Sequence, residues 1–113
     1  MLAKNSRLKK NKEFDLVFKE GKTSYGDFLG VKIKKNNLES NRFGILLGTK
    51  VSKLAITRNL YKRRIKSILR SQNIKLKTGF DCVIIVLPKI INKNYQEIKV
   101  EIEKTFIKLK FYR

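Results

Sequence analysis

The residues of this chain that are best suited to chemistry form a run of cations between positions 58 and 70. The run, RNLYKRRIKSILR, contains no carboxylate, and no Asp or Glu occurs between Glu39 and Asp81. Ammonium and guanidinium groups at this density bind phosphates without reading base sequence. A surface that needed charge only for solubility would mix its signs. The run therefore predicts a polyanionic partner, and its six cations are Arg58, Lys62, Arg63, Arg64, Lys66 and Arg70.

The rest of the chain is also strongly basic. Lys and Arg number 28 against 9 Asp and Glu in 113 residues, which gives a formal net charge of +19. A domain of this length has a radius of gyration of roughly 13 Å, so this charge repels itself. We expect marginal stability at low salt. The 42% hydrophobic content is sufficient for one nucleic-acid-binding domain over 1–113, in which residues 1–10 are expected to form a basic N-terminal arm.

Groups that could catalyse a reaction by themselves are missing from the sequence. The chain has no histidine and one cysteine, which excludes an imidazole base and the usual zinc clusters. Cys82 lies in an apolar run and is expected to be a buried, inert thiol. Glu97 and Glu101 are interpreted as surface partners of Lys104. We therefore expect no catalytic residue and no metal site, so that another molecule would carry the reactive groups of any reaction.

The elements that must position the cations follow from the spacing of apolar residues. The strand over 80–87 is nearly continuous in apolar residues, so it should be central and covered on both faces. A helix between two strands predicts an α+β sandwich with at least one parallel pair. The expected elements are a helix over 11–20, a short strand over 22–25, strands over 27–35 and 42–49, a helix over 58–72, a strand over 80–87 and a helix after Asn94.

The first and last helices carry recognisable end signals. Asn11 is expected to cap the first helix and Gly21 to close it in a left-handed conformation. Asn94 and Glu97 predict a capping box at the start of the last helix. Apolar residues share one face of each helix. These are Phe14, Val17 and Phe18 in the first helix, and Tyr95, Ile98, Ile102, Phe106 and Leu109 in the last.

The basic helix divides into an apolar stripe and a polar flank. At roughly 100° per residue, one stripe faces the core and an adjoining flank faces outward. Arg64 falls on the opposite side. The stripe consists of Tyr61, Ile65, Ile68 and Leu69, and the flank of Asn59, Lys62, Arg63, Lys66 and Arg70.

The chain resembles the protein component of bacterial ribonuclease P. The likeness rests first on Arg58-Asn59 followed by Lys62-Arg63, with Lys66 and Arg70 at helical spacing. Three further segments resemble the family in the same order, so that the likeness covers nearly the whole chain. They are RLKKNKEFDLVFKEG (7–21), GILLGTK (44–50) and FDCVIIV (80–86). The chain departs from the family pattern at Thr49 and Leu87, where basic residues are usual, and at Arg64, where an apolar residue is usual.

The resemblance implies a single α-β-β-β-α-β-α domain with helices packed on a mixed central sheet. It implies that the basic helix forms a left-handed crossover, against the usual preference. It also implies a noncatalytic subunit of an endoribonuclease, which binds a catalytic RNA and assists removal of the 5′ leader from precursor tRNA. The RNA would hold the Mg²⁺ ions, with no cofactor bound by the protein alone. The expected partners are this RNA and precursor tRNA, in the cytoplasm, with no membrane and no protein partner required.

The resemblance also assigns roles to individual residues. Arg58, Asn59, Lys62, Arg63, Lys66 and Arg70 would bind the catalytic RNA. Phe14, Phe18, Lys50 and Arg58 would line a cleft for the single-stranded leader. Arg7, Lys9, Lys10 and Lys53 would add electrostatic contacts.

Simpler interpretations remain open for several of these residues. By helical spacing alone, Phe14 and Phe18 would be core residues, and Asn59 would be a helix cap. Lys50 and Lys53 would be ordinary loop lysines, and Arg64 would be either an RNA contact or a solvated charge. The alternative function is a structural RNA-binding protein of the ribosome, which would bind ribosomal RNA and leave precursor tRNA unchanged.

Overall fold

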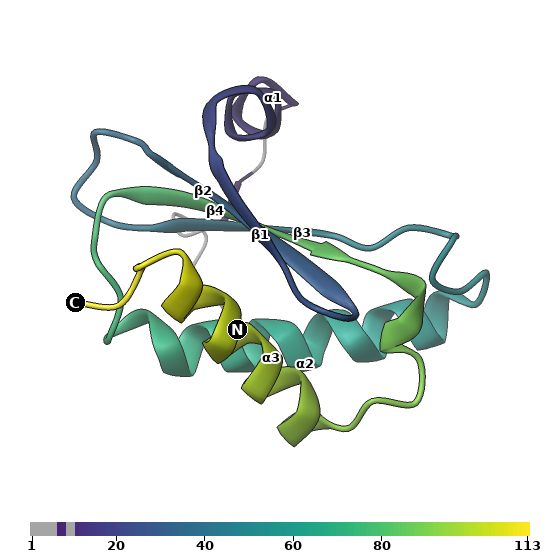
Figure 1. Ribbon diagram of the computed structural model, residues 1–113. Coiled ribbons are helices and arrows are strands. Elements are labelled where there is room, and N and C mark those ends of the chain that lie inside the picture. The colour runs from purple at the N-terminus through teal and green to yellow at the C-terminus, as the bar shows by residue number, and fades with distance from the viewer. Residues whose placement is uncertain (1–6, 9–10) are drawn as a thin grey trace.

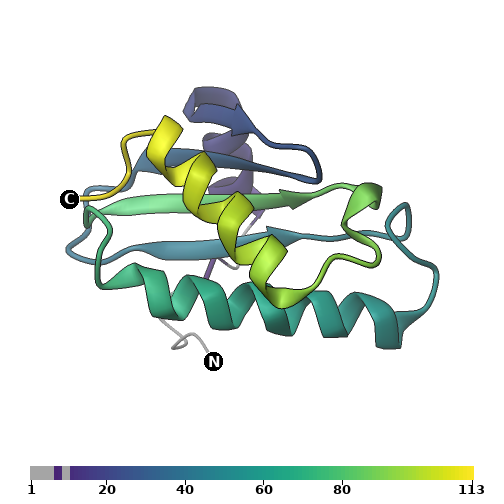
Figure 2. The same ribbon diagram turned by 60° about the horizontal axis from the view of Figure 1, so that its bottom comes forward.

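The computed structural model describes residues 7–8 and 11–113, and these form a four-stranded sheet with helices on both faces. The strand order is β1-β2-β4-β3, with β3 and β4 parallel and the other pairs antiparallel. Helices α2 and α3 cover one face and α1 lies on the other (Figures 1 and 2). The elements are α1 (Asn11–Glu20), β1 (Lys22–Tyr25), β2 (Leu29–Lys35), β3 (Arg42–Leu46), α2 (Ala55–Asn73), β4 (Phe80–Val86), a 3₁₀ turn η2 (Pro88–Ile90) and α3 (Tyr95–Lys108).

This architecture confirms the predicted α+β sandwich, its element order and the parallel pair joined through the basic helix. The hand of the β3–α2–β4 crossover stays a prediction. None of the helices in the described part of the chain is long and apolar enough to cross a membrane.

The main core lies between the sheet and the helices α2 and α3. The predicted stripe of α2 is confirmed, because Tyr61, Ile65, Ile68 and Leu69 are all buried. In α3 the stripe is confirmed from Ile98 onward, but Tyr95 is 39% exposed. Tyr95 is the first residue of α3, so its ring lies at the edge of the core, where its hydroxyl is 3.1 Å from Ser67 Oγ. The capping box of Asn94 and Glu97 is confirmed.

Strand β4 is the central strand that its apolar sequence predicts. Cys82, Val83 and Ile84 are fully buried, because α2 and α3 cover one side of the strand and α1 covers the other. Burial raises the pKa of the Cys82 thiol well above its usual value, with a smaller contribution from Asp81. The thiol is therefore protonated and shielded, as expected.

Three predicted boundaries differ by two residues or more. The strand predicted over 42–49 ends at Leu46. Helix α2 begins at Ala55 instead of Arg58, and its N-cap residue Leu54 makes no side-chain cap, so the sequence gives no start signal there. Strand β2 begins at Leu29 instead of Asp27. The backbone N–H groups of residues 27–29 donate to the side chain of Glu101.

Glu101 thus stabilises the fold by accepting backbone hydrogen bonds, and its interpretation as a surface partner of Lys104 is wrong. Its Oε2 accepts from the N–H of Phe28 at 2.8 Å and from that of Leu29 at 3.0 Å. Its Oε1 accepts from the N–H of Asp27 at 3.2 Å. A Cβ at Gly26 would lie 2.7 Å from the carboxyl carbon of Glu101. This carboxylate therefore holds the β1–β2 turn against α3.

The end of α1 also differs from expectation. Gly21 was expected in the left-handed region, but Gly79 is the glycine with a positive φ (83°) in the described residues. Gly21 instead permits a close approach, because a Cβ there would lie 2.9 Å from the carbonyl oxygen of Ile33. The glycine therefore lets the end of α1 come down onto β2.

We predict that Glu101→Ala lowers the free energy of unfolding by about 1–3 kcal/mol, because partly buried backbone donors lose a charged acceptor. Glu39→Ala is the matched control, because Glu39 is exposed and its substitution removes the same charge. Urea unfolding at fixed ionic strength measures both variants. Equal stabilities for the two variants would show that the Glu101 contacts do not hold the turn.

Candidate nucleic-acid interface

The strand register places three rows of residues across the sheet face on which α1 lies. Adjacent strands pair residue by residue, so each row runs perpendicular to the strands. The rows are Lys34–Asp81–Arg42, Thr23–Lys32–Val83–Gly44 and Tyr25–Gly30–Ile85–Leu46.

Helix α1 covers the first two rows. Val17 packs with Val83 in a small second core, and both side chains are fully buried. The Phe14 ring sits over Gly44, where a Cβ would lie 2.5 Å from the ring. Lys32 Nζ lies 5.2 Å from the centre of the Phe18 ring, a cation–π distance. Because Gly44 has no side chain, the Phe14 ring can pack directly against β3.

An ionic contact fixes α1 to the first row. Arg42 donates from Nε to Asp81 Oδ1 at 2.9 Å and from Nη2 to Asp81 Oδ2 at 2.8 Å. Arg42 Nη1 also donates to Glu13 Oε2 on α1. The hydrogen bonds that Arg42 donates to Asp81 are the main cause that raises the pKa of the Arg42 guanidinium. One guanidinium therefore joins β3, β4 and α1.

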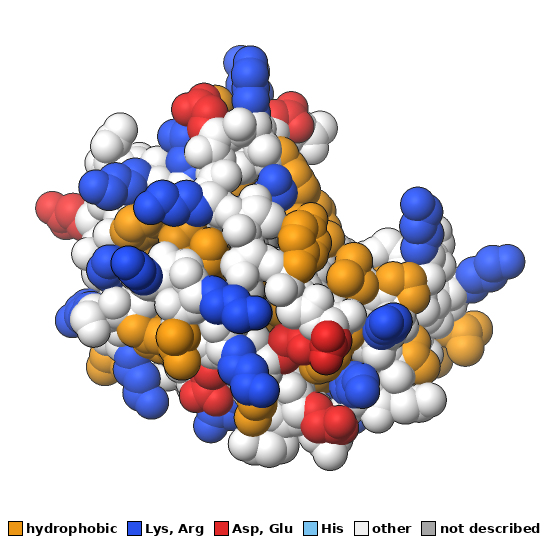
Figure 3. Space-filling model, in the orientation of Figure 1, with side chains coloured by type: hydrophobic (Ala, Val, Ile, Leu, Met, Phe, Trp, Pro, Cys, Tyr) orange, Lys and Arg blue, Asp and Glu red, His pale blue; other side chains and the backbone are white. Residues whose placement is uncertain are grey.

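The third row is left open and forms an apolar trough beside α1, which we define by Phe18, Tyr25, Leu46 and Ile85. Tyr25 is 52% exposed, Phe18 39% and Leu46 37%, and Ile85 is half-buried. Figure 3 shows apolar surface in the hollow that separates α1 from the β3–α2 end of the molecule. The sequence analysis missed Tyr25, Leu46 and Ile85. The signal that could have found them is glycine inside strands, because the Tyr25 ring occupies the space above Gly30.

The basic flank of α2 lies along one side of the sandwich. The helix has 19 residues, which corresponds to about 28 Å. Arg63, Arg70 and Asn59 are exposed, whereas Lys62 and Lys66 are half-buried. Because the helix begins at Ala55, Asn59 lies inside it, and the interpretation of Asn59 as a helix cap is wrong.

The aromatic edge of α1 and the basic flank of α2 meet at β3. A hollow of about 180 Å³ there is lined by Phe14, Lys62, Lys66 and Arg7, among others, and by no carboxylate. Arg7 forms a parallel bridge with Phe43. Its Nε is buried and has no hydrogen-bond partner among the described residues. A buried donor without an acceptor is unusual in a folded protein, and a phosphate oxygen would satisfy it.

Other predicted residues lie away from this hollow. Lys50 and Lys53 are exposed on the connection between β3 and α2. Arg58 Nη1 donates to the backbone oxygen of Ser52 at 2.9 Å, so it braces the same connection. The predicted contacts at Lys9 and Lys10 and most of the predicted arm lie outside the described residues.

Arg64 is not a solvated charge, and its contact with RNA stays a prediction. It is half-buried, and its Nη1 donates to the backbone oxygen of Lys93 at 3.1 Å. Its guanidinium carbon lies 5.4 Å from the centre of the Tyr61 ring. Arg64 therefore ties α2 to the segment before α3.

Comparisons with known proteins agree with this geometry. The family model for ribonuclease P matches residues 2–110. The ribonuclease P protein component of Pseudanabaena sp. (strain PCC 6903) is 35% identical over 111 residues, covering 97% of this chain and 96% of that protein. The component of Synechocystis sp. (strain ATCC 27184 / PCC 6803 / Kazusa) is 38% identical over 106 residues, covering 93% and 86%.

Solved structures show the same fold. The ribonuclease P protein of Thermotoga maritima superposes with a TM-score of 0.79 at 28% identity, over 87% of this chain and 92% of that one. The Staphylococcus aureus protein gives a TM-score of 0.88 at 22% identity, over 96% and 98%. The match of the family model to nearly the whole sequence, together with this fold, shows that the chain belongs to the bacterial ribonuclease P protein family.

Proposed function

We propose that this chain, as the protein component of the ribonuclease P ribonucleoprotein, binds the catalytic RNA along α2 and the single-stranded 5′ leader of precursor tRNA in the apolar trough. The complex would remove the leader by endonucleolytic cleavage, in the cytoplasm. The observation that carries this proposal is the hollow at β3, because it brings Phe14 of the predicted cleft against Lys62 and Lys66 of the predicted RNA-binding helix.

The α2 flank suits the backbone of a folded RNA. Its cations lie at intervals between Arg58 and Arg70, over about 18 Å of the helix, and the chain has no acid between Glu39 and Asp81 to neutralise them. Such a flank binds phosphates and positions the RNA without reading its sequence. The residues proposed for this contact are Arg58, Asn59, Lys62, Arg63, Lys66 and Arg70.

The trough suits an unpaired strand. Exposed aromatic rings offer stacking surfaces to successive bases, each contributing about 1–3 kcal/mol. Phe18 and Tyr25 have this exposure, whereas Phe14 forms the covered edge over Gly44. Lys50 lies on the connection that borders the β3 end of the trough, and Arg58 holds that connection. Lys50 would therefore contact phosphates and Arg58 would support it.

The donor atoms of this chain do not fit a resident Mg²⁺ site. Mg²⁺ prefers clustered carboxylate oxygens, and the described residues contain no group of three His, Cys, Asp or Glu side chains arranged for a metal. Glu13 and Asp81 both bond to Arg42. We therefore propose that the RNA holds the Mg²⁺ ions used in the reaction and that the protein contributes binding alone.

The test of the proposed function is reconstitution with a bacterial ribonuclease P RNA at low millimolar Mg²⁺, following 5′-leader cleavage of a precursor tRNA. RNA alone and protein alone are the controls. We expect cleavage to appear or accelerate only when both are present. Binding to ribosomal RNA without any effect on cleavage would instead favour the ribosomal alternative.

We predict that the double variant Lys62→Ala and Lys66→Ala weakens binding to the catalytic RNA. The negative slope of log K against log salt should become shallower by about 1–2, because up to two phosphate contacts are lost. Lys99→Ala with Lys104→Ala removes the same charge from α3 and is the control. Filter binding across a salt series measures both. If the two double variants behaved alike, the α2 flank would not be the RNA contact.

We predict that Phe18→Ala reduces affinity for precursor tRNA several-fold in the holoenzyme and leaves affinity for mature tRNA unchanged, because a stacking surface for the leader is lost. Leu16→Ala is the matched control, since Leu16 is an exposed apolar residue of the same helix outside the trough. Equilibrium binding of the two tRNA forms measures the difference. An equal loss for both forms would assign Phe18 to folding instead of leader binding.

A further inference from the structure

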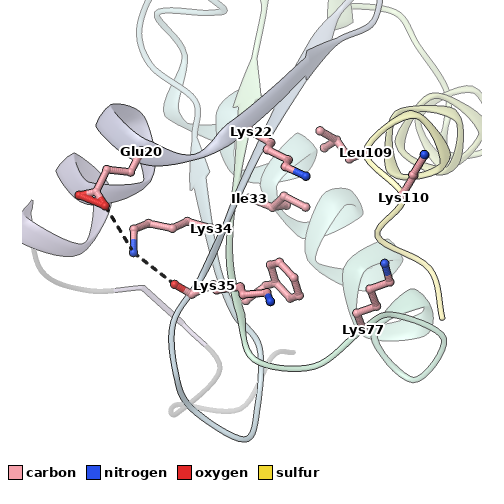
Figure 4. Close-up of a pocket in the computed structure, with 9 residues that line it drawn as sticks. Glu20, Lys22, Ile33, Lys34, Lys35, Lys77, Leu109 and Lys110 are labelled. Carbon is pink, nitrogen blue, oxygen red and sulfur yellow. Dashed lines mark hydrogen bonds and ion pairs between the residues drawn. The ribbon is translucent and has the colours of Figure 1, made fainter.

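A second basic hollow, which we call the lysine pocket, lies where the sheet meets the end of α3. It has a volume of about 350 Å³, within the range of pockets that hold small ligands. Its floor is apolar and consists of Ile33, Phe80 and Leu109, and Figure 4 shows Lys22 and Lys77 reaching into it from different sides. Its five lysines are Lys22, Lys34, Lys35, Lys77 and Lys110.

The lysine pocket is separate from the trough. Ile33 belongs to the main core under α2 and α3, so it faces away from α1. Phe80 pairs with Lys35 at one end of the β2–β4 ladder, whereas the trough row with Ile85 lies near the other end. The floor of the pocket is therefore on the opposite face of the sheet and at the opposite end of the strands, and Glu20 and Lys34 line its rim from the α1 side.

The lysines come from separate parts of the chain and remain largely unneutralised. They lie on β1, on β2, on the α2–β4 connection and just after α3. Lys34 pairs with Glu20 at 3.9 Å. The other four have no carboxylate within 4.0 Å among the described residues. Folding thus gathers like charges that are far apart in sequence, which costs free energy unless an anion binds.

The charge balance of this pocket is not a general property of the surface. The lysine pocket is lined by five lysines and by one acid, Glu20. Three other hollows on the described surface are closer to balance: Lys93 and Lys104 with three acids, Lys12 and Lys19 with Asp15, and Lys104 and Lys108 with two acids. The strongly basic hollows are the one at β3, which lies in the proposed RNA interface, and the lysine pocket. The two hollows are similar in charge, which suggests that they bind the same kind of ligand.

We infer that the lysine pocket is a second RNA site, which takes an unpaired nucleotide with its base on the apolar floor and its flanking phosphates on the lysines. Ammonium groups bind phosphate oxygens as point charges, and the half-buried Phe80 ring offers an aromatic surface to a base. The inference rests on the proposed function for its ligand, since RNA is the polyanion already present in the complex. An RNA bound there as well as on α2 would contact both ends of the sandwich.

The first test removes three charges from the pocket with Lys35→Gln, Lys77→Gln and Lys110→Gln. The control removes three from elsewhere with Lys89→Gln, Lys99→Gln and Lys104→Gln. Both full-length variants are titrated with a bacterial ribonuclease P RNA and, separately, with precursor tRNA. For one of these RNAs, we expect the slope of log K against log salt to become shallower by about two in the pocket variant, because three contacts each contribute roughly 0.7 on a single strand. The control should change this slope much less.

The second test does not depend on the stability of a triple variant. Cys82 is fully buried, so a cysteine introduced as Lys110→Cys can be labelled selectively in the native protein with an iron–EDTA reagent. Lys99→Cys is the control position on α3. We expect the label at position 110 to cut the bound RNA at a discrete site and the label at position 99 to give no cut there.

The outcomes separate this inference from the proposed function. If Lys62→Ala with Lys66→Ala weakens RNA binding but the pocket variant matches its control and position 110 gives no cut, the second site is overturned and the proposed function stands. The pocket would then serve another anion, such as an acidic protein segment. If neither the α2 variant nor the pocket variant affects RNA binding, the proposed function fails together with the inference.

Discussion

The position of α1 depends on one guanidinium. Arg42 binds Asp81 through two hydrogen bonds and reaches Glu13 on α1, so strands β3 and β4 and the helix share a single ionic centre. Asp81 is only 6% exposed, and a buried carboxylate that lost its partner would be strongly unfavourable. With α1 held there, Phe14 lies over Gly44 and Phe18 lies beside the open row of the sheet. The helix thereby forms one side of the trough. The proposed leader site is therefore a consequence of this ionic contact.

The few acidic residues of the chain serve mainly inside the fold. Of the nine acids, Glu13 and Asp81 fix α1, Glu101 holds the β1–β2 turn, Glu97 caps α3 and Glu20 pairs with Lys34. Helix α2 itself contains no acid, and the lysine pocket has Glu20 against its five lysines. A surface of this kind stays highly charged, which favours a polyanion and accounts for the expected dependence of the free protein on salt.

Local features of the fold could be predicted from the sequence with good accuracy. The α1 range, the central strand, the stripe of α2 and the capping box of α3 all follow from apolar spacing and from side chains within one turn of each other. The basic flank of α2 was equally visible, because its residues are close in sequence. The predictions for Glu101 and Gly21 were wrong, because both residues depend on partners that are remote in the chain. The alternative interpretation of Asn59 as a helix cap was wrong because α2 begins without a capping side chain, and the backbone partner of Arg64 is also remote in the chain.

The sequence by itself determined the charge and the amphipathic helices, and the charge already indicates a polyanionic partner. Only the tertiary structure decided where the binding surfaces lie. The trough depends on the register of four strands, and the lysine pocket depends on five lysines between positions 22 and 110 that meet after folding. Periodicity reports which face of its own element a residue occupies, but contacts between elements are fixed by pairing and packing over the whole chain.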